Sequence, residues 1–160
     1  MSEAPRNSEA RTAARLAAVQ AVYQMELVEA GAEEVIEEFV EHRFGPEPQE
    51  GDEEFFAALV RGVPERQREI DKAVAACLSA NWTLTRVDSI LRAILRVAAF
   101  EMIARKDVPA RVVIDEYVGI AHAFFGGDEP GFVNAALDAM AHRKRAPEFG
   151  ETPPEDEIEF

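Results

Sequence analysis

The stretch TRVDSILRAILRVAAFEMIAR, residues 85–105, organises the rest of this chain. At about 100° per residue, its first half is amphipathic, with Arg92 and Arg96 one turn apart on the polar side. In the second half, Phe100 and Ile103 occupy the side that had been polar, so the helix becomes apolar almost all round. The pattern therefore predicts a central helix that other elements surround, with Arg92 and Arg96 pointing out of the core.

Local signals mark both ends of this predicted helix. Thr85 followed three residues later by Asp88 resembles a capping box in which the acid is shorter than usual. The sequence DVP at residues 107–109 would stop the helix, because proline cannot continue it.

Six further segments repeat apolar residues at helical spacing, and Gly or Pro separates most of them. Their expected ranges are 8–30, 32–44, 53–63, 65–78, 109–125 and 129–142. In the first of these, the apolar face is expected to consist of Leu16, Val19, Tyr23 and Leu27. Asp52 is a plausible N-cap, Pro64 would kink its helix or start a new one, and Pro109 would sit at the first helical position. No strand pattern appears, so the sequence predicts an all-α fold of about seven helices.

The two ends of the chain differ from the rest in composition. Residues 1–7 and the acidic, Pro-rich residues 146–160 are expected to be disordered. Residues 8–145 are expected to form one helical domain, with an N-terminal part of about 8–79 and a C-terminal part of about 80–145.

Length and composition limit the class of protein. A chain of 160 residues with 48% apolar composition can bury one real core. There is no apolar stretch long enough for a transmembrane helix, and the N-terminus does not resemble a secretory signal. Cys77 is the only cysteine, which excludes an internal disulfide and suits a reducing compartment. We therefore expect a cytoplasmic protein with no membrane partner.

The net charge of −14 is unevenly distributed. Residues 26–54 carry −11 and residues 146–160 carry −6, which leaves +3 for the remainder. A mildly basic body of this kind would still be able to bind a polyanion locally.

The sequence lacks the usual patterns of catalytic and metal sites. His42, His122 and His142 lie in different segments, without a second ligand at metal-binding spacing. Glycine-rich phosphate-binding motifs and a nucleophile elbow are also absent. We therefore expect no metal, no cofactor and no enzymatic activity. Glu101 falls near the apolar side of its helix, so a helix N-terminus or an arginine is expected to donate hydrogen bonds to it.

Arginines and two aromatic residues suggest a different activity. Five arginines could line a path for RNA, and two aromatic side chains could stack on its bases. These residues are Arg6, Arg11, Arg15, Arg92 and Arg96, with Tyr23 and Phe132 as the aromatics. The alternative is that the arginines are ordinary helical surface charge and the aromatics belong to the core.

Four segments of the chain resemble the NusB family of bacterial transcription antitermination factors. They are AVQAVYQMEL (18–27), ILRAILRVAAFEM (90–102), DVPARVVIDEYVGIA (107–121) and FGGDEPGFVNAALD (125–138). The similarity extends over about residues 11–142, in the order and spacing of the family.

The resemblance implies a fold of two packed three-helix bundles and a function in transcription. It implies that the protein pairs with the ribosomal protein NusE, and that the pair binds the boxA element of nascent ribosomal RNA transcripts. This complex would join other Nus factors on RNA polymerase and promote read-through of terminators, without catalysing a reaction. Some family members form homodimers that cover the RNA-binding face, and the sequence leaves the oligomeric state open.

The resemblance also implies roles for particular residues. Those that match family positions associated with RNA are Arg11 and Arg15 of an arginine-rich motif, Tyr23, Arg96, Asp128 and Phe132. Thr12 and Ala13 stand where the family often has further arginines, which implies weak RNA binding by the protein alone. The rival hypothesis is a helical adaptor that binds only proteins and docks a basic partner on its acidic helix-loop region.

Overall fold

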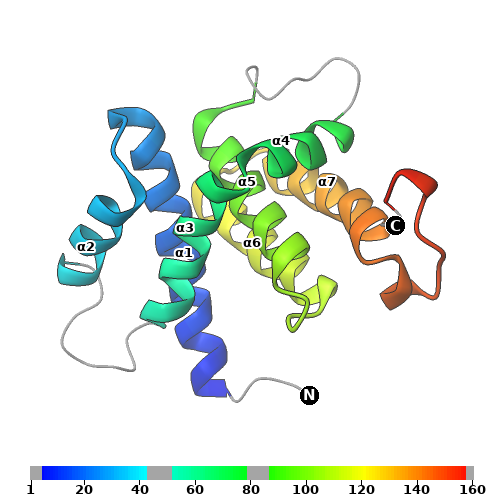
Figure 1. Cartoon of the computed structure of the whole chain (residues 1–160), viewed down its shortest axis with the longest axis horizontal. Coiled ribbons are helices and arrows are strands. Elements are labelled where there is room, and N and C mark those ends of the chain that lie inside the picture. Colours follow the sequence, from blue (N-terminus) through cyan, green and yellow to red (C-terminus); the bar gives the residue numbers. More distant parts are fainter. Residues whose placement is uncertain (1–4, 43–51, 79–86, 158–160) are drawn as a thin grey trace. The chain divides into compact units, whose positions relative to one another are not determined.

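The computed structural model describes residues 5–42, 52–78 and 87–157 of the chain (Figure 1). In these ranges the chain forms seven α-helices and two short 3-10 helices, and it contains no strand, which confirms the all-α prediction. The α-helices are α1 (Pro5–Val28), α2 (Ala32–His42), α3 (Glu53–Glu65), α4 (Gln67–Ala76), α5 (Ser89–Ala104), α6 (Ala110–Phe124) and α7 (Glu129–Lys144). The 3-10 helices, η2 (Ala146–Phe149) and η3 (Glu155–Glu157), follow α7. No helix in these ranges is long and apolar enough to cross a membrane.

The chain divides into two compact units, Met1–Arg66 and Gln67–Phe160. The first unit contains α1 to α3, and the second contains α4 to α7 with both 3-10 helices. The division therefore comes earlier than the one near residue 79 that the sequence suggested. The reason is that α4 packs against α5 and α7, which places it in the second unit.

In the first unit, α1, α2 and α3 all pack against one another. The rings of Phe39 and Phe56 stack with their centroids 5.7 Å apart, which joins α2 to α3. The face that α1 buries is rich in alanine and includes Ala14, Ala18 and Ala21. The predicted apolar face of α1 was therefore only partly right: Val19 is buried, but Leu27 is 66% exposed. Alanine lets neighbouring helices approach closely, a property that a search for large apolar residues overlooks.

Local capping signals set the limits of α3. The carboxylate of Asp52 accepts a 3.0 Å hydrogen bond from the Phe55 amide, which confirms Asp52 as the N-cap. Pro64 lies inside the last turn of α3, and the helix ends just after it, at Glu65. The Arg66 amide still donates to the Gly62 carbonyl at 3.1 Å, and α4 begins at the next residue. The predicted helix break at Pro64 thus occurs two residues later.

In the second unit, α5 packs against α4, α6 and α7, as the central-helix prediction required. Its buried residues run around the whole circumference and include Ile94, Leu95, Val97 and Phe100. The helix begins at Ser89, later than predicted, because the Asp88 carboxylate is itself the N-cap and accepts hydrogen bonds from the amides of Ile90 (2.9 Å) and Leu91 (3.4 Å). Thr85, which was expected to begin the capping box, lies outside the described residues.

Arg145, just after α7, closes the C-terminal end of α5. Its guanidinium is buried and donates hydrogen bonds to four backbone carbonyls, those of Met102 (2.7 Å), Val108 (2.9 Å), Arg105 (2.9 Å) and Glu101 (3.4 Å). The last carbonyls of a helix have no hydrogen-bond partner within the helix. A guanidinium at this end donates hydrogen bonds to them, and its positive charge interacts favourably with the helix dipole. Arg145 follows α7 in the chain, but it caps the C-terminal end of α5.

Glu148 extends this arrangement to α6. Its carboxylate accepts a 2.8 Å hydrogen bond from the Ala110 amide, in the first turn of α6, and a 2.5 Å bond from Arg145. Burial alone would raise the pKa of the Glu148 carboxyl, but these two hydrogen bonds outweigh it and lower that pKa below its ordinary value. The residues after α7 therefore tie α5 and α6 together.

Parts of the two ends for which the sequence predicted disorder have regular secondary structure. Helix α1 begins at Pro5, and residues 1–4 lie outside the described residues. Residues 146–157 form η2, a turn and η3, and Ala146 is fully buried. These acidic residues are ordered because basic side chains at the end of α7 pair with them.

Candidate nucleic-acid interface

Two predicted RNA-binding arginines of the first unit converge on one aromatic ring. The guanidinium carbon of Arg11 lies 4.5 Å from the centroid of the Phe55 ring, and that of Arg15 lies 5.0 Å from it. The Arg11 Nε also lies 3.7 Å from Oδ2 of Asp52, and the Arg11 side chain is 22% exposed. No signal in the sequence links Phe55 to arginines that lie on α1. The contact appears only when α1 packs on α3.

Burial separates the roles of these two arginines. Arg15 is completely buried, whereas Arg11 keeps part of its side chain in solvent. A buried guanidinium on an aromatic face stabilises the fold by a cation–π contact, and it cannot reach a phosphate without leaving that position. Arg11 is therefore the better placed of the two for a phosphate contact.

The other two predicted residues of α1 are Arg6 and Tyr23. The backbone of Arg6 lies in the first turn of the helix, and its side chain lies outside the described residues. Tyr23 is half-exposed. The helical rise places it about 18 Å along the axis from Arg11 and about a third of a turn around it. The structure therefore places Tyr23 and Arg11 on separate stretches of the α1 surface.

The two arginines of α5 do not form the freely projecting pair that the sequence predicted. Arg96 donates two hydrogen bonds to the Asp71 carboxylate of α4, at 2.9 and 3.1 Å, and its side chain is only 18% exposed. Arg92 donates to the Val87 carbonyl at 3.1 Å and to Ser89 Oγ at 3.4 Å, so it folds back over the start of its own helix. Arg96 thus links α4 to α5, and Arg92 supports the N-terminus of α5.

Asp128 and Phe132 do lie together, at the N-terminal end of α7. The Phe132 amide donates a 3.0 Å hydrogen bond to the Asp128 carbonyl, Asp128 is exposed and Phe132 is half-exposed. The Asp128 side chain makes no capping hydrogen bond at this N-terminus. A carboxylate that accepts hydrogen bonds from base amino groups, next to a ring on which a base can stack, suits recognition of single-stranded RNA.

Glu129 follows directly and was not predicted. Its Oε2 is buried and has no hydrogen-bond partner among the described residues. A Cβ at Gly127 would lie 3.1 Å from this oxygen, so a residue with no side chain at this position leaves room for the carboxylate. The sequence offered no signal for this arrangement, because it depends on how Glu129 folds back over the loop.

The described residues contain no group of three or more His, Cys, Asp or Glu side chains arranged to hold a metal ion.

Comparison with known proteins adds to this geometry. The family described as the NusB family matches residues 12–142 of the chain. The chain is similar to the transcription antitermination protein NusB of Maricaulis maris, with 56% identity over 92% of this chain and 96% of that protein. It is also similar to the protein of that name from Bartonella tribocorum, with 50% identity over 88% of this chain and 94% of that protein.

Solved structures show the same fold. T. maritima NusB superposes with a TM-score of 0.75 and 28% identity, covering 93% of this chain and 99% of that one. A chain in a structure described as a plectonemic RNA supercoil superposes with a TM-score of 0.72 and 24% identity, covering 81% of this chain and 91% of that one. At that identity the second likeness concerns the fold alone.

Proposed function

This chain belongs to the NusB family, and on that basis we propose that it is an RNA-binding transcription antitermination factor. It pairs with the ribosomal protein NusE, binds boxA RNA of nascent ribosomal RNA transcripts and promotes read-through by RNA polymerase, together with other Nus factors. The protein acts in the cytoplasm and catalyses no reaction. The observation that supports this most strongly is the 56% identity to a transcription antitermination protein over nearly the full length of both chains.

Two surfaces of the described residues have the chemistry that RNA binding needs. Arg11 supplies a partly exposed cation for a phosphate, and Phe132 and Asp128 supply a ring and a carboxylate for an unpaired base. Tyr23 offers a second ring, and Arg6 adds one more positive charge to the sequence of α1. Arg15 contributes indirectly, because it stabilises the Phe55 ring on which Arg11 lies.

Arg92 and Arg96 have a smaller part in this proposal than the sequence alone suggested. Arg96 is held by Asp71 in a two-point hydrogen bond, and a phosphate would have to break both of these bonds to bind it. The hydrogen bonds that Arg92 donates to the Val87 carbonyl and to Ser89 Oγ have neutral acceptors, so each is weaker than the bonds between Arg96 and the Asp71 carboxylate.

The partner protein compensates for the small number of exposed arginines. A chain with a net charge of −14 repels RNA at long range, so we expect weak binding by the protein alone. A basic ribosomal protein would add phosphate contacts and would hold the RNA in a binding-competent position. Binding should therefore be cooperative, and RNA should tighten the protein pair by the same factor as NusE tightens RNA binding.

The test measures binding of fluorescently labelled boxA RNA, with a scrambled RNA of equal composition as control, in the presence and absence of purified NusE. We expect tight binding of boxA only when NusE is present, and much weaker binding of the scrambled RNA. Phe132→Asp should reduce the discrimination, since stacking contributes about 1–3 kcal/mol per base. Equal affinity for both RNAs in the presence of NusE would exclude the antitermination function and would leave the protein-binding adaptor as the explanation.

A further inference from the structure

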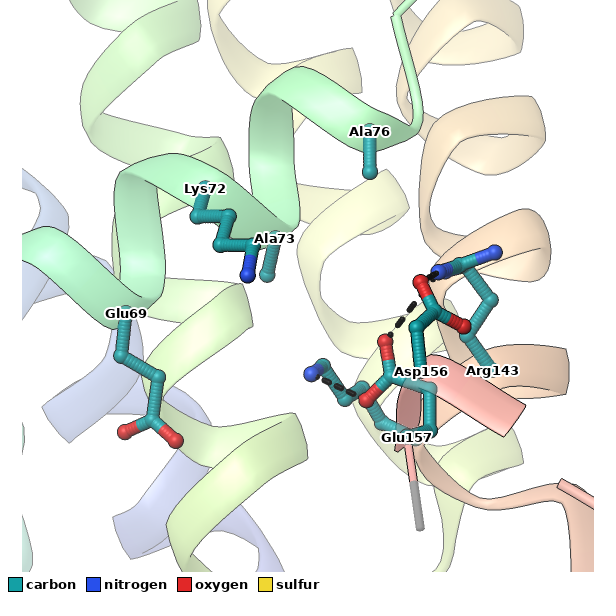
Figure 2. Close-up of a pocket in the computed structure, with 8 residues that line it drawn as sticks. Glu69, Lys72, Ala73, Ala76, Arg143, Asp156 and Glu157 are labelled. Carbon is teal, nitrogen blue, oxygen red and sulfur yellow. Dashed lines mark hydrogen bonds and ion pairs between the residues drawn. The ribbon is translucent and has the colours of Figure 1, made fainter. Parts of the chain in front are cut away.

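A group of cations lies between α4 and the end of α7. Lys72 of α4 and Arg143 and Lys144 of α7 line one pocket. Figure 2 shows that the other wall of this pocket comes from η3, with Asp156 and Glu157 pointing at the basic side chains. We call Lys72, Arg143 and Lys144 the α7 cationic patch.

The C-terminal residues turn back to reach this patch. Gly150 adopts a φ of +70°, in the left-handed region that favours glycine, and it reverses the chain after η2. Directly after this turn, Glu151 lies with its carboxylate 2.5 Å from Nδ1 of His142, and the ring of Phe149 stacks on the His142 ring at 4.2 Å. The turn therefore anchors the following residues on α7.

Beyond this anchor, two carboxylates occupy the patch. Asp156 pairs with Arg143, and Glu157 lies 2.5 Å from Nζ of Lys144 and 3.3 Å from Arg143. Glu157 is the better covered of the two acids, with a side chain 14% exposed against 66% for Asp156. These carboxylate oxygens contact Arg and Lys side chains in the way that phosphate oxygens do.

These contacts are of a kind that a polyanion can displace. Ion pairs between partly exposed side chains contribute little each and weaken as salt rises. A phosphate carries charge and hydrogen-bond acceptors equal to those of a carboxylate, and successive phosphates of one strand would engage several cations at once. RNA fits this patch better than an anionic membrane, because three cations within one small pocket match a flexible strand rather than a flat surface.

We propose that the α7 cationic patch is an additional RNA phosphate-binding surface, and that residues 151–157 cover it as an intramolecular competitor. The identity of the ligand rests on the proposed function, whereas the competition rests on the ion pairs just described. Displacement of these residues would uncover Arg143 and Lys144 beside Lys72, which is already exposed and lines the same pocket. RNA binding through the patch is then limited by the free energy that holds the C-terminal residues in place.

The test compares two full-length variants that each remove three negative charges. The first carries Glu151→Gln, Asp156→Asn and Glu157→Gln, and the matched control carries Glu37→Gln, Glu41→Gln and Asp115→Asn, all at exposed positions. The probe is a fluorescein-labelled oligouridylate, and its affinity is measured by fluorescence anisotropy over a range of KCl concentrations. We expect the first variant to bind about tenfold more tightly than the control at low salt. Its salt dependence should be steeper by about 0.7 per added phosphate contact.

Adding Arg143→Ala and Lys144→Ala to the first variant should cancel the gain. Equal affinities of the first variant and the control would overturn the proposal, and so would a gain that survives loss of the two cations. These outcomes are separate from the boxA test. If boxA discrimination is preserved and the C-terminal acids have no effect, only the proposal of a covered RNA-binding surface is rejected. If these acids have a clear effect but boxA is not discriminated from scrambled RNA, only the proposed antitermination function is rejected.

Discussion

The hydroxyl of Tyr117 on α6 donates a 2.8 Å hydrogen bond to Oε1 of Glu101 on α5, and both side chains are completely buried. A buried carboxylate is costly unless hydrogen bonds compensate for its lost hydration. Tyr117 therefore provides part of the compensation that makes Glu101 tolerable at the centre of the second unit. The sequence predicted a partner for Glu101 but expected an arginine or a helix N-terminus rather than a tyrosine.

Tyr117→Phe removes this donor while keeping the ring. We expect the free energy of unfolding to fall by about 1–3 kcal/mol, the usual cost of leaving a buried polar group without its partner. Urea denaturation followed by circular dichroism measures the change. Tyr23→Phe, at a half-exposed position on α1, is the control and should have a much smaller effect. Equal stability of wild type and Tyr117→Phe would show that the hydrogen bond is not needed.

Arg96→Ala tests whether this arginine supports the fold or contacts phosphate. Because Arg96 and Asp71 share two hydrogen bonds, Arg96→Ala and Asp71→Ala should each destabilise the protein, with effects that are not additive. A double-mutant cycle should give a coupling energy of about 0.5–3 kcal/mol, toward the lower end because the pair is partly exposed. The slope of RNA affinity against salt should stay unchanged. If the slope of RNA affinity against salt fell by about 0.7 in a folded Arg96→Ala protein, Arg96 would be a phosphate contact after all.

Arg11 and Arg15 should respond differently to the same substitution. Arg11→Ala should leave stability nearly unchanged and reduce the salt slope of RNA binding by about 0.7, one phosphate contact. Arg15→Ala should mainly lower the thermal unfolding temperature, because it leaves a cavity beside Phe55 and removes a buried cation–π contact. Thermal unfolding and RNA titration of both variants separate the two effects. The reverse pattern would mean that Arg15 leaves its buried position to bind RNA.

His142 should make attachment of residues 151–157 depend on pH. The hydrogen bond with Glu151 raises the pKa of His142 above its ordinary value of about 6.5, and Asp138 at 3.7 Å adds to the shift. A pKa raised in the folded state means that the stabilisation is fully present below the unfolded pKa and is lost as pH rises through the folded one. An NMR titration of His142 should show the raised pKa, and Glu151→Gln should move it down. An unaltered titration in Glu151→Gln would contradict the contact.

The sequence predicted the helices because each carries its own information. Apolar residues at helical spacing give the number and order of the helices, and carboxylates such as Asp52 cap a helix through bonds to the next few amides. Partners from distant parts of the chain were not predictable in this way. Asp71 and Arg96 lie 25 residues apart, and neither neighbourhood contains a sign of the other.

The acidic C-terminal residues show the same limit. Their composition is typical of disorder, because few apolar groups are available to offset the entropy lost on folding. Composition does not reveal that Arg143 and Lys144 end the preceding helix within reach of these acids. The same limit applies to the candidate RNA-binding site. The resemblance to a family selected its residues, and packing decided which of them remain exposed.

The position of Arg145 has a consequence for biosynthesis. Chains emerge from the ribosome N-terminus first, and domains tend to fold as units in that order. The first unit can form as soon as α3 has emerged, since all its helices lie before Gln67. In contrast, the carbonyl of Met102 accepts a hydrogen bond from Arg145, which is synthesised 43 residues later. The end of α5 therefore stays incomplete on the nascent chain, and the second unit should reach its final stability only after Arg145 has left the exit tunnel.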